Sequence, residues 1–397
     1  DKDSIFPLDG VVRLHHQVRH IYALHNAQDK LGLHITEGPH KDTQDLRVHA
    51  FSWFNRWLKD DRSLIERTAT KQFEPEQLRV FETLPDDQKN TDIHETFTQE
   101  ADAPTVPKNA TEWTVMRDKW MTGLREKVFR GWPSDQVAGS LDVKPVQQAV
   151  HDGVRLTQYE FTSQGPVRLP LYVMHKDGLK DAELVVLNVL DDAGWRKFLS
   201  MARGGFAKPL HNEAQPQVDA EAWQSQRDML HNHKWVMAYA PPRGVGPTAW
   251  NPDERKQVQH RRRFMLLGQT LDGMRTWDAR RAVQAVRRVD DVKDAALWLQ
   301  GERGAAGIAL YASLFEPEVK RLDLWHLPTS HRDGPIFLNV LRVLDVPAAL
   351  AMAAERSQVR VYDSADANAW SFVSETAKAL KWDDKQFVLR RTEGGGQ

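Results

Sequence analysis

The stretch Ala296-Leu-Trp-Leu-Gln300, followed at once by Gly301-Glu-Arg-Gly-Ala305, is the part of the sequence that decides the fold. Its first half is a short apolar run typical of a buried strand, and its second half contains the two glycines of a sharp turn. Similar apolar runs precede and follow it, with helical patterns between them. Alternating strands and helices of this kind predict an α/β sheet with crossover connections and flanking helices.

The pattern around this stretch predicts one sheet over residues 151–391. Residues 154–161 and 167–175 are expected to form an antiparallel pair, and the continuous apolar runs at 184–190 and 235–240 suit strands covered on both faces. A long helix is expected over 262–288. Later strands are expected at 322–327, 359–362 and 387–389.

The first sixty residues have a different order of elements. Asp3 lies in a loop, and a helix is expected over 11–23. A strand-like segment at 31–35 then leads to a Gly-Pro turn that ends in His40. A histidine on such a turn is exposed yet held, which suits a general base. An amphipathic helix is expected over 46–58.

This order of acidic loop, helix, strand, histidine turn and helix is the last stage of an α/β-hydrolase chain, where the serine precedes the acid and the acid precedes the histidine. The segments Asp3-Ser-Ile-Phe-Pro7 and Gly38-Pro-His-Lys-Asp42 resemble the acetylxylan-esterase-like hydrolases, bacterial enzymes that remove acyl groups from carbohydrates. The resemblance implies that Asp3 is the catalytic acid and His40 the catalytic base. It also implies that residues 1–62 are the C-terminal segment of a catalytic α/β-hydrolase domain.

The later sheet repeats the hydrolase order but lacks its reactive groups. In an active α/β hydrolase the turn after the strand would read Gly-x-Ser-x-Gly, whereas Arg303 stands at the serine position here. A guanidinium is always protonated and cannot attack an ester. Asp363 or Asp366 could take the acid position, but residues 392–396 contain no histidine. We therefore expect residues 151–391 to form a degenerate α/β-hydrolase-like domain, a pseudoenzyme domain without nucleophile or base.

Residues 63–150 are expected to connect these two parts. They are rich in Pro, Asp, Glu, Thr and Gln. Within them, the spacing of Trp113, Met116, Trp120 and Leu124 predicts an amphipathic helix over 112–130. This helix is expected to pack on one of the flanking domains.

Composition excludes several classes of function. The 54 basic and 55 acidic residues give a net charge of −1, so no nucleic-acid or membrane partner is expected. There are no cysteines, which rules out disulfides, thiol nucleophiles and thiolate metal sites. His15-His16 and the pair His231 and His233 lack a partner at ligand spacing, so we expect surface histidines, no metal site and no cofactor.

The leading prediction is a carboxylic ester hydrolase acting on acetylated carbohydrate through a Ser-His-Asp mechanism. His40 and Asp3 would serve a serine in an N-terminal segment outside this chain, so that the chain alone would be inactive. The alternative is a non-catalytic scaffold or carbohydrate-binding module, with some of the 14 tryptophans stacking on sugars. A third interpretation makes Thr270 a nucleophile, but helical patterns flank it on both sides.

Overall fold

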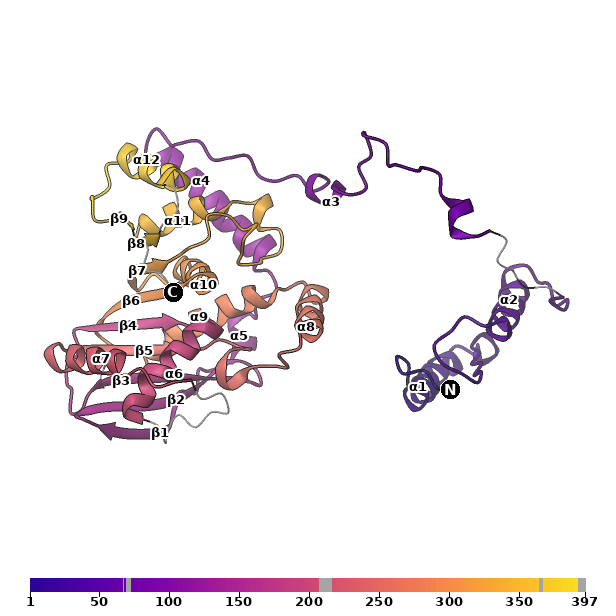
Figure 1. Cartoon of the computed structure of the whole chain (residues 1–397), viewed down its shortest axis with the longest axis horizontal. Coiled ribbons are helices and arrows are strands. Elements are labelled where there is room, and N and C mark those ends of the chain that lie inside the picture. Colours follow the sequence, from indigo (N-terminus) through magenta and orange to yellow (C-terminus); the bar gives the residue numbers. More distant parts are fainter. Residues whose placement is uncertain (67, 69–72, 207–215, 291, 364–366, 392–397) are drawn as a thin grey trace. The chain divides into compact units, whose positions relative to one another are not determined.

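The structure, a computed structural model, describes residues 1–66, 68, 73–206, 216–290, 292–363 and 367–391. The chain forms two compact units, which we call unit 1 (Asp1–Ile93) and unit 2 (His94–Gln397). Figure 1 shows that unit 1 consists of helices and turns, and unit 2 of a large sheet with helices around it. Within the described residues, no helix has both the length and the apolar character that a membrane span requires.

Unit 1 contains the two helices that the apolar spacing predicted. The elements are α1 (Leu8–Leu24), the 3-10 turn η1 (Gln28–Lys30), α2 (Gln44–Leu58) and the 3-10 turn η2 (Pro75–Leu78). Helix α2 begins where the Thr43 hydroxyl accepts a hydrogen bond from the amide of Leu46. This cap satisfies an amide that has no partner within the helix.

The strand expected at residues 31–35 is not formed, because this segment pairs with no other strand among the described residues. The start of the chain holds the following turn instead. The amide of Lys2 donates to the carbonyl of Gly38 at 3.0 Å, and the amide of Gly38 donates to the carboxylate of Asp1 at 2.9 Å. These bonds bring the histidine turn beside the acidic loop.

Unit 2 is built on one nine-stranded sheet, counted over the described residues. The strand order is β1-β2-β3-β5-β4-β6-β7-β8-β9, with antiparallel pairing from β1 to β5 and parallel pairing from β5 to β9. The strands are β1 (Lys144–His151), β2 (Val154–Gln164), β3 (Val167–Lys176), β4 (Leu184–Val189), β5 (Trp235–Ala240), β6 (Ala296–Glu302), β7 (Val319–Trp325), β8 (Gln358–Asp363) and β9 (Phe387–Arg391). All strands predicted in this region are present.

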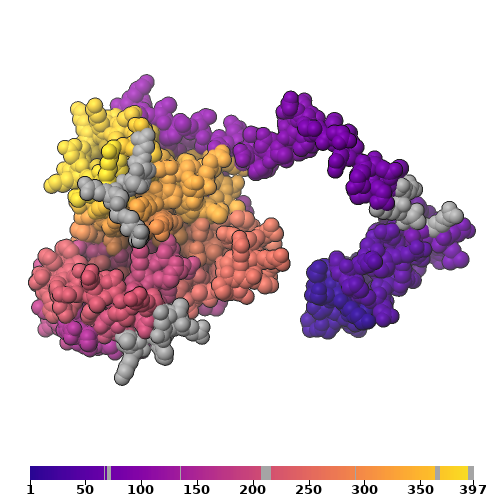
Figure 2. Space-filling model, viewed as in Figure 1, coloured from indigo at the N-terminus to yellow at the C-terminus, as the bar shows by residue number. Residues whose placement is uncertain are grey.

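Helices flank this sheet. They are α4 (Ala110–Gly123), α5 (Asp135–Ala138), α6 (Asp192–Phe206), α7 (Ala220–Asn232), α8 (Glu254–Leu266), α9 (Leu271–Val286), α10 (Gly304–Ser313), α11 (Val346–Ala354) and α12 (Ser371–Ala379). The short helix α3 (Ile93–Thr96) lies in the segment that precedes them. A π-helical turn, Leu124–Val128, continues α4, so the predicted amphipathic helix is present. Figure 2 shows the C-terminal elements, in yellow, gathered at one end of unit 2.

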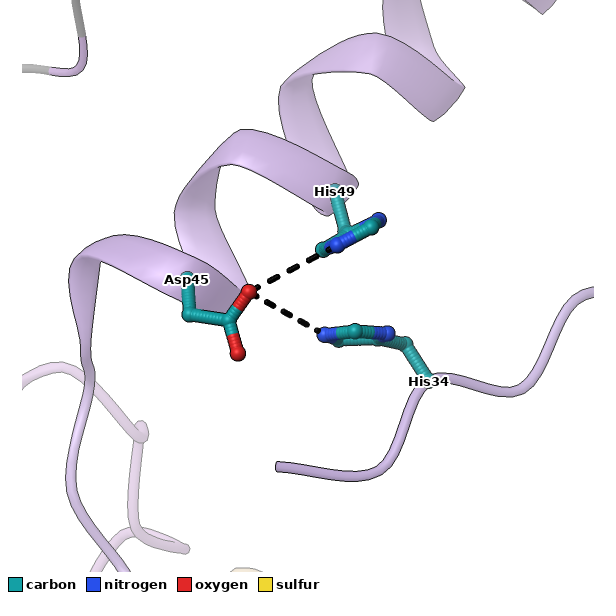
Figure 3. Close-up of side chains that lie close together, drawn as sticks. All are labelled: His34, Asp45 and His49. Atoms are coloured by element: carbon teal, nitrogen blue, oxygen red, sulfur yellow. Dashed lines mark ion pairs between the residues drawn. The ribbon is translucent and has the colours of Figure 1, made fainter. Parts of the chain in front are cut away.

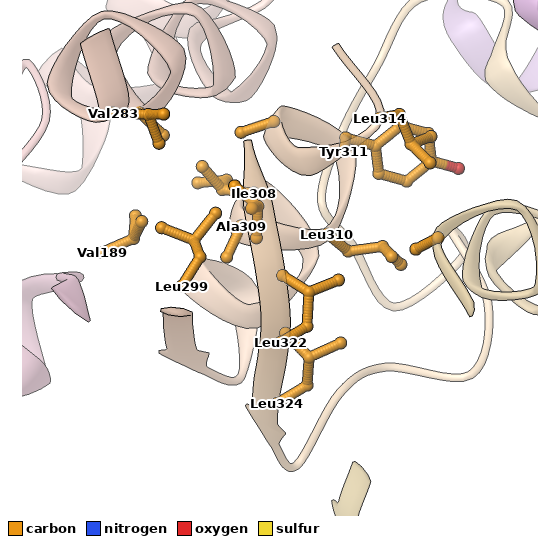
Figure 4. Packing of buried hydrophobic residues seen from close by; sticks show 14 of the residues in the cluster. Val189, Val283, Leu299, Ile308, Ala309, Leu310, Tyr311, Leu314, Leu322 and Leu324 are labelled. Atoms are coloured by element: carbon orange, nitrogen blue, oxygen red, sulfur yellow. The ribbon is translucent and has the colours of Figure 1, made fainter. Parts of the chain in front are cut away.

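Two hydrophobic cores cover the two faces of the sheet. Along β4, Val185 and Leu187 belong to the larger core, whereas Leu184 and Val186 belong to the smaller one. This alternation is the period of two that a strand imposes on its side chains. The larger core contains side chains of α4, α9, α10 and α11, and Figure 4 shows its centre. The smaller core contains side chains of α6 and α7.

The single helix expected over residues 262–288 is two helices, α8 and α9. Gly268 has a φ of +70°, a conformation that interrupts a helix and that glycine adopts at low cost. The hydroxyl of Thr270 then accepts a hydrogen bond from the amide of Gly273 at 2.9 Å and caps α9. Thr270 is therefore a helix cap, which argues against a nucleophile at this position.

A buried ion pair links α9 to the loop after β5. The carboxylate of Asp278 accepts hydrogen bonds from the Arg243 side chain at 2.7 and 2.8 Å, from the Arg243 amide at 2.9 Å and from the Ser163 hydroxyl at 2.6 Å. Only 1% of the Asp278 side chain is exposed. A buried charge of this kind is tolerated because its partners satisfy it.

Candidate functional site

A hydrogen-bonded pair of Asp3 and His40 lies on the surface of unit 1. Nδ1 of His40 is 2.7 Å from Oδ2 of Asp3. The other carboxylate oxygen accepts hydrogen bonds from the amides of Ile5 at 2.7 Å and Phe6 at 3.1 Å. The structure therefore brings together the two residues that the sequence analysis predicted as acid and base.

The electrostatics of this pair suit an ionised acid beside an accessible imidazole. Partial burial raises the pKa of Asp3, but hydrogen bonds from His40 and from two amides outweigh it, so the pKa is below its ordinary value of 3.8. The Asp3 carboxylate is therefore charged at neutral pH and can stabilise a protonated imidazole. The His40 side chain is 58% exposed, which leaves it accessible to a group from outside.

The pair borders a surface hollow of about 400 Å³. Apolar side chains of Phe6, Leu8 and Leu46 form part of its wall. Among the described residues that line the hollow, Thr36 is the one with a side-chain hydroxyl, and no hydrogen bond joins that hydroxyl to His40. The described residues that line the hollow thus include a carboxylate in contact with an imidazole but no serine.

Unit 2 has a strained turn between β6 and α10. Arg303 follows β6 and precedes α10 with φ 52° and ψ −122°, a conformation that L-residues rarely adopt. A Cβ on Gly301 would lie 2.6 Å from the carbonyl oxygen of Ala305, so only glycine lets the helix pack this closely on the strand. The sequence analysis correctly located this turn and the arginine at its apex.

A cavity of about 700 Å³ lies at the carboxyl ends of the parallel strands. In open α/β sheets this edge is where ligands usually bind. Asn188, Gln300, Glu302 and His326 are among its polar lining, and the ammonium of Lys197 donates to Glu302 at 2.6 Å. Trp325, also in the wall, stacks on Tyr362 with ring centroids 4.5 Å apart.

This cavity contains no assembled serine site within the described residues. Ser200 and His326 both line it, but the Ser200 hydroxyl donates to the main-chain carbonyl of Gln217. Of the two acid candidates, Asp363 is the last residue of β8 and Asp366 lies outside the described residues, as do residues 392–397.

A buried histidine elsewhere in unit 2 has a structural role. Nε2 of His331 lies 2.7 Å from the Tyr311 hydroxyl, and Nδ1 lies 2.7 Å from the carbonyl oxygen of Pro335. Burial lowers the pKa of His331. Both ring nitrogens are engaged, so this histidine has no nitrogen left to activate a nucleophile.

Asp191 marks the start of helix α6. Its carboxylate accepts a hydrogen bond at 2.7 Å from the amide of Gly194, in the first turn of that helix. This bond satisfies an amide that has no partner within the helix.

Relieving the strain at Arg303 is expected to stabilise unit 2. Arg303→Gly should raise the free energy of unfolding by about 1 kcal/mol, because the strain of about 1–3 kcal/mol is partly offset by the entropy of an added glycine. Urea unfolding followed by tryptophan fluorescence measures this change. Arg303→Ala is the control, because it removes the side chain and keeps the strain. A glycine variant no more stable than the alanine variant would contradict the expectation.

The sequence analysis missed a cluster of His34, Asp45 and His49, shown in Figure 3. Asp45 and His49 lie four residues apart on α2 and therefore face the same side. His34 comes from the segment before the histidine turn. The spacing of Asp45 and His49 is visible in the sequence, but only the folded chain brings His34 to them.

No protein-family model matches the sequence, and no curated protein matches it significantly. Solved structures do match. A candidate acetyl xylan esterase from Bacteroides fragilis matches with a TM-score of 0.55 and 12% identity, over 72% of this chain and 76% of that protein. The chain therefore has an α/β-hydrolase fold. A glucuronoyl esterase from Solibacter usitatus shares this hydrolase fold with a TM-score of 0.54 and 13% identity, over 74% of this chain and 94% of that protein. The predicted fold class and the predicted resemblance to this hydrolase fold are confirmed.

Proposed function

We propose that the chain provides the acid and the base of an ester hydrolase that acts on acylated carbohydrate by a Ser-His-Asp mechanism. The observation that carries this proposal is the 2.7 Å contact between Nδ1 of His40 and Oδ2 of Asp3. The serine would come from a segment outside these 397 residues, in the same or another polypeptide. Residues 1–62 would then complete a catalytic hydrolase domain.

On this proposal each of the two residues has its own task. Asp3 would hold Nδ1 of His40 so that Nε2 faces the solvent and the incoming serine. His40 would take the serine proton as the hydroxyl attacks the ester carbonyl, and would later return a proton to the leaving alcohol. The ionised Asp3 would stabilise the imidazolium formed between these two steps.

Exposed apolar side chains on unit 1 support a missing partner segment. On α1, Leu14 is 59% and Ile21 54% exposed, and on α2, Phe54 is 56% and Leu58 77% exposed. Isolated apolar residues are common on surfaces, but contiguous apolar area usually marks an interface. The remainder of a hydrolase domain would cover these faces and bring its serine to the hollow.

The substrate class is proposed from structural relatives of the same fold. Two solved proteins with this fold carry the names acetyl xylan esterase and glucuronoyl esterase. Both names refer to esters of carbohydrates. A fold alone does not fix a substrate, so the acyl group is left to experiment.

A second candidate function rests on the cavity of unit 2. It has a volume of about 700 Å³, includes Trp325 in its wall and has Arg303 at the nucleophile turn beside it. An aromatic platform with polar neighbours suits a sugar ring. In this case unit 2 would bind carbohydrate without cleaving it.

A serine-directed fluorophosphonate probe tests the catalytic proposal, because it labels only serines that a neighbouring base activates. The 397-residue chain alone should show neither labelling nor hydrolysis of p-nitrophenyl acetate. Protein produced together with any coding sequence that precedes Asp1 in its gene should be labelled on a serine of the added part. Labelling of unit 2 in the isolated chain would refute the assignment of the serine. Binding of xylan oligosaccharides by a chain that is inactive with or without the added sequence would favour the second candidate.

A further inference from the structure

We propose that His34, Asp45 and His49 form a binding site for a transition-metal ion of the Zn²⁺ class. One nitrogen of each histidine and one carboxylate oxygen of Asp45 lie within 4.8 Å of one another. The three side chains converge from α2 and from the segment before the histidine turn, as Figure 3 shows. His34 also lines the hollow beside the Asp3–His40 pair, but the three ligands do not include that pair and the proposal does not depend on the proposed esterase function.

The distances from the two histidine nitrogens to the Asp45 oxygen fit ligands of one metal ion better than they fit direct hydrogen bonds. Nε2 of His34 and Nε2 of His49 are both 3.5 Å from the same oxygen of Asp45. An N–H···O hydrogen bond is usually about 2.9–3.0 Å long. By contrast, two ligands bound to one tetrahedral zinc at about 2.0–2.1 Å lie about 3.3 Å apart. Each histidine nitrogen is therefore spaced from the Asp45 oxygen almost as a zinc ion would hold them.

The two imidazoles lie together beside the carboxylate. The rings of His34 and His49 stack with centroids 3.6 Å apart and an angle of 29° between their planes. This contact keeps both histidines next to Asp45.

The donor set indicates the class of ion. Two imidazoles and one carboxylate suit zinc and its neighbours in the first transition row, whereas calcium and magnesium prefer oxygen ligands only. Three protein ligands leave a fourth position for water or a further ligand. The side chains are 36%, 60% and 55% exposed for His34, Asp45 and His49, so an ion can reach them from solvent.

A metal at this site would tie two parts of unit 1 together. Helices α1 and α2 contain no buried residue, so unit 1 has little apolar core of its own. Small units with weak cores are often stabilised by a bound metal. The loop between His34 and Asp45 contains His40, so the ion would fix both ends of the histidine turn.

Isothermal titration calorimetry, with zinc chloride added to the 397-residue chain, tests the site. We expect one equivalent of Zn²⁺ to bind. Loss of a residue that only orients a metal ligand costs about 10- to 100-fold in affinity, so removal of a ligand itself should cost at least that much. His34→Gln, Asp45→Asn and His49→Ala should each weaken binding by about 100-fold or more. Cobalt substitution should give visible absorption bands that are absent from the three variants.

The double variant His15→Ala/His16→Ala is the matched control, because it removes two histidines of unit 1 from outside the cluster. Its zinc affinity should equal that of the unchanged chain. His34 lies outside α2, so loss of binding in His34→Gln cannot come from unfolding of that helix; circular dichroism checks the other two variants. The proposal is overturned if the chain binds no zinc, if the cluster variants bind it as tightly as the unchanged chain, or if the control loses it.

Discussion

His40→Ala is expected to lower kcat for acetyl-ester cleavage by about 10⁴- to 10⁶-fold in protein that carries the serine segment. The reason is that the imidazole is the only base in contact with the acid Asp3 at the hollow of unit 1, over the described residues. Without it, the serine hydroxyl stays protonated and attacks poorly. Asp3→Asn should cost about 10⁴-fold, because the amide favours the wrong tautomer of the imidazole.

Steady-state kinetics with p-nitrophenyl acetate and acetylated xylan measures both effects. His20→Ala is the control, because His20 is an exposed histidine on α1 outside the hollow. Its kcat should remain within twofold or so of the unchanged protein, as for surface substitutions in general. Turnover that persists in His40→Ala would show that a different residue acts as base.

The pH dependence of the pair follows from the lowered pKa of Asp3. A carboxylate whose pKa is lower in the folded state stabilises that state above its unfolded pKa. This contribution is lost as the pH falls from the ordinary value of 3.8 through the lower folded value. The Asp3–His40 contact is therefore expected to persist at neutral pH and to be lost only in acid.

Asp278→Ala is expected to destabilise unit 2 by about 3–5 kcal/mol. Removal of the carboxylate leaves the guanidinium of Arg243 buried without its partner, at a side-chain exposure of 9%. It also removes the acceptor for the Ser163 hydroxyl. Urea unfolding measured by tryptophan fluorescence and circular dichroism would show the midpoint shift.

Asp177→Ala provides a matched control for this loss. Asp177 pairs with Arg155 at 2.6 Å, but their side chains are 40% and 34% exposed. Exposed pairs of this kind contribute about 0–1 kcal/mol. A cost for Asp278→Ala as small as that for Asp177→Ala would mean that water reaches Arg243. Replacing Arg243 and Asp278 together with apolar residues should recover part of the stability, because no charge is then left unpaired.

Sequence patterns predicted β2 to β9 of unit 2, because central strands such as β4 and β5 are continuous apolar runs, whereas the mostly polar β1 was not predicted. The sequence patterns predicted two other features incorrectly, a helix break and a strand. The apolar period over residues 262–288 continues across Gly268, so the break between α8 and α9 was missed even though Gly268 and the cap residue Thr270 mark it. Residues 31–35 have the composition of a strand, but a strand needs a neighbour to pair with.

Of the two candidate sites in unit 1, one was predicted from the sequence and the other was not. Asp3 and His40 were found because motif and order point to them, and their 2.7 Å contact agrees with that prediction. The roles of these two residues in catalysis remain predictions. The cluster around Asp45 was missed because one of its members, His34, is brought to α2 only by the path of the loop.

The turn at Arg303 has a consequence for protein engineering. Its φ of 52° is imposed by the packing of α10 on β6 through Gly301, and no reactive side chain is needed to maintain it. Arg303→Ser would therefore place a hydroxyl at the apex of the strained turn between β6 and α10, without redesign of the backbone. A histidine would still have to be positioned against that hydroxyl, so the backbone geometry and the catalytic base are separate design problems.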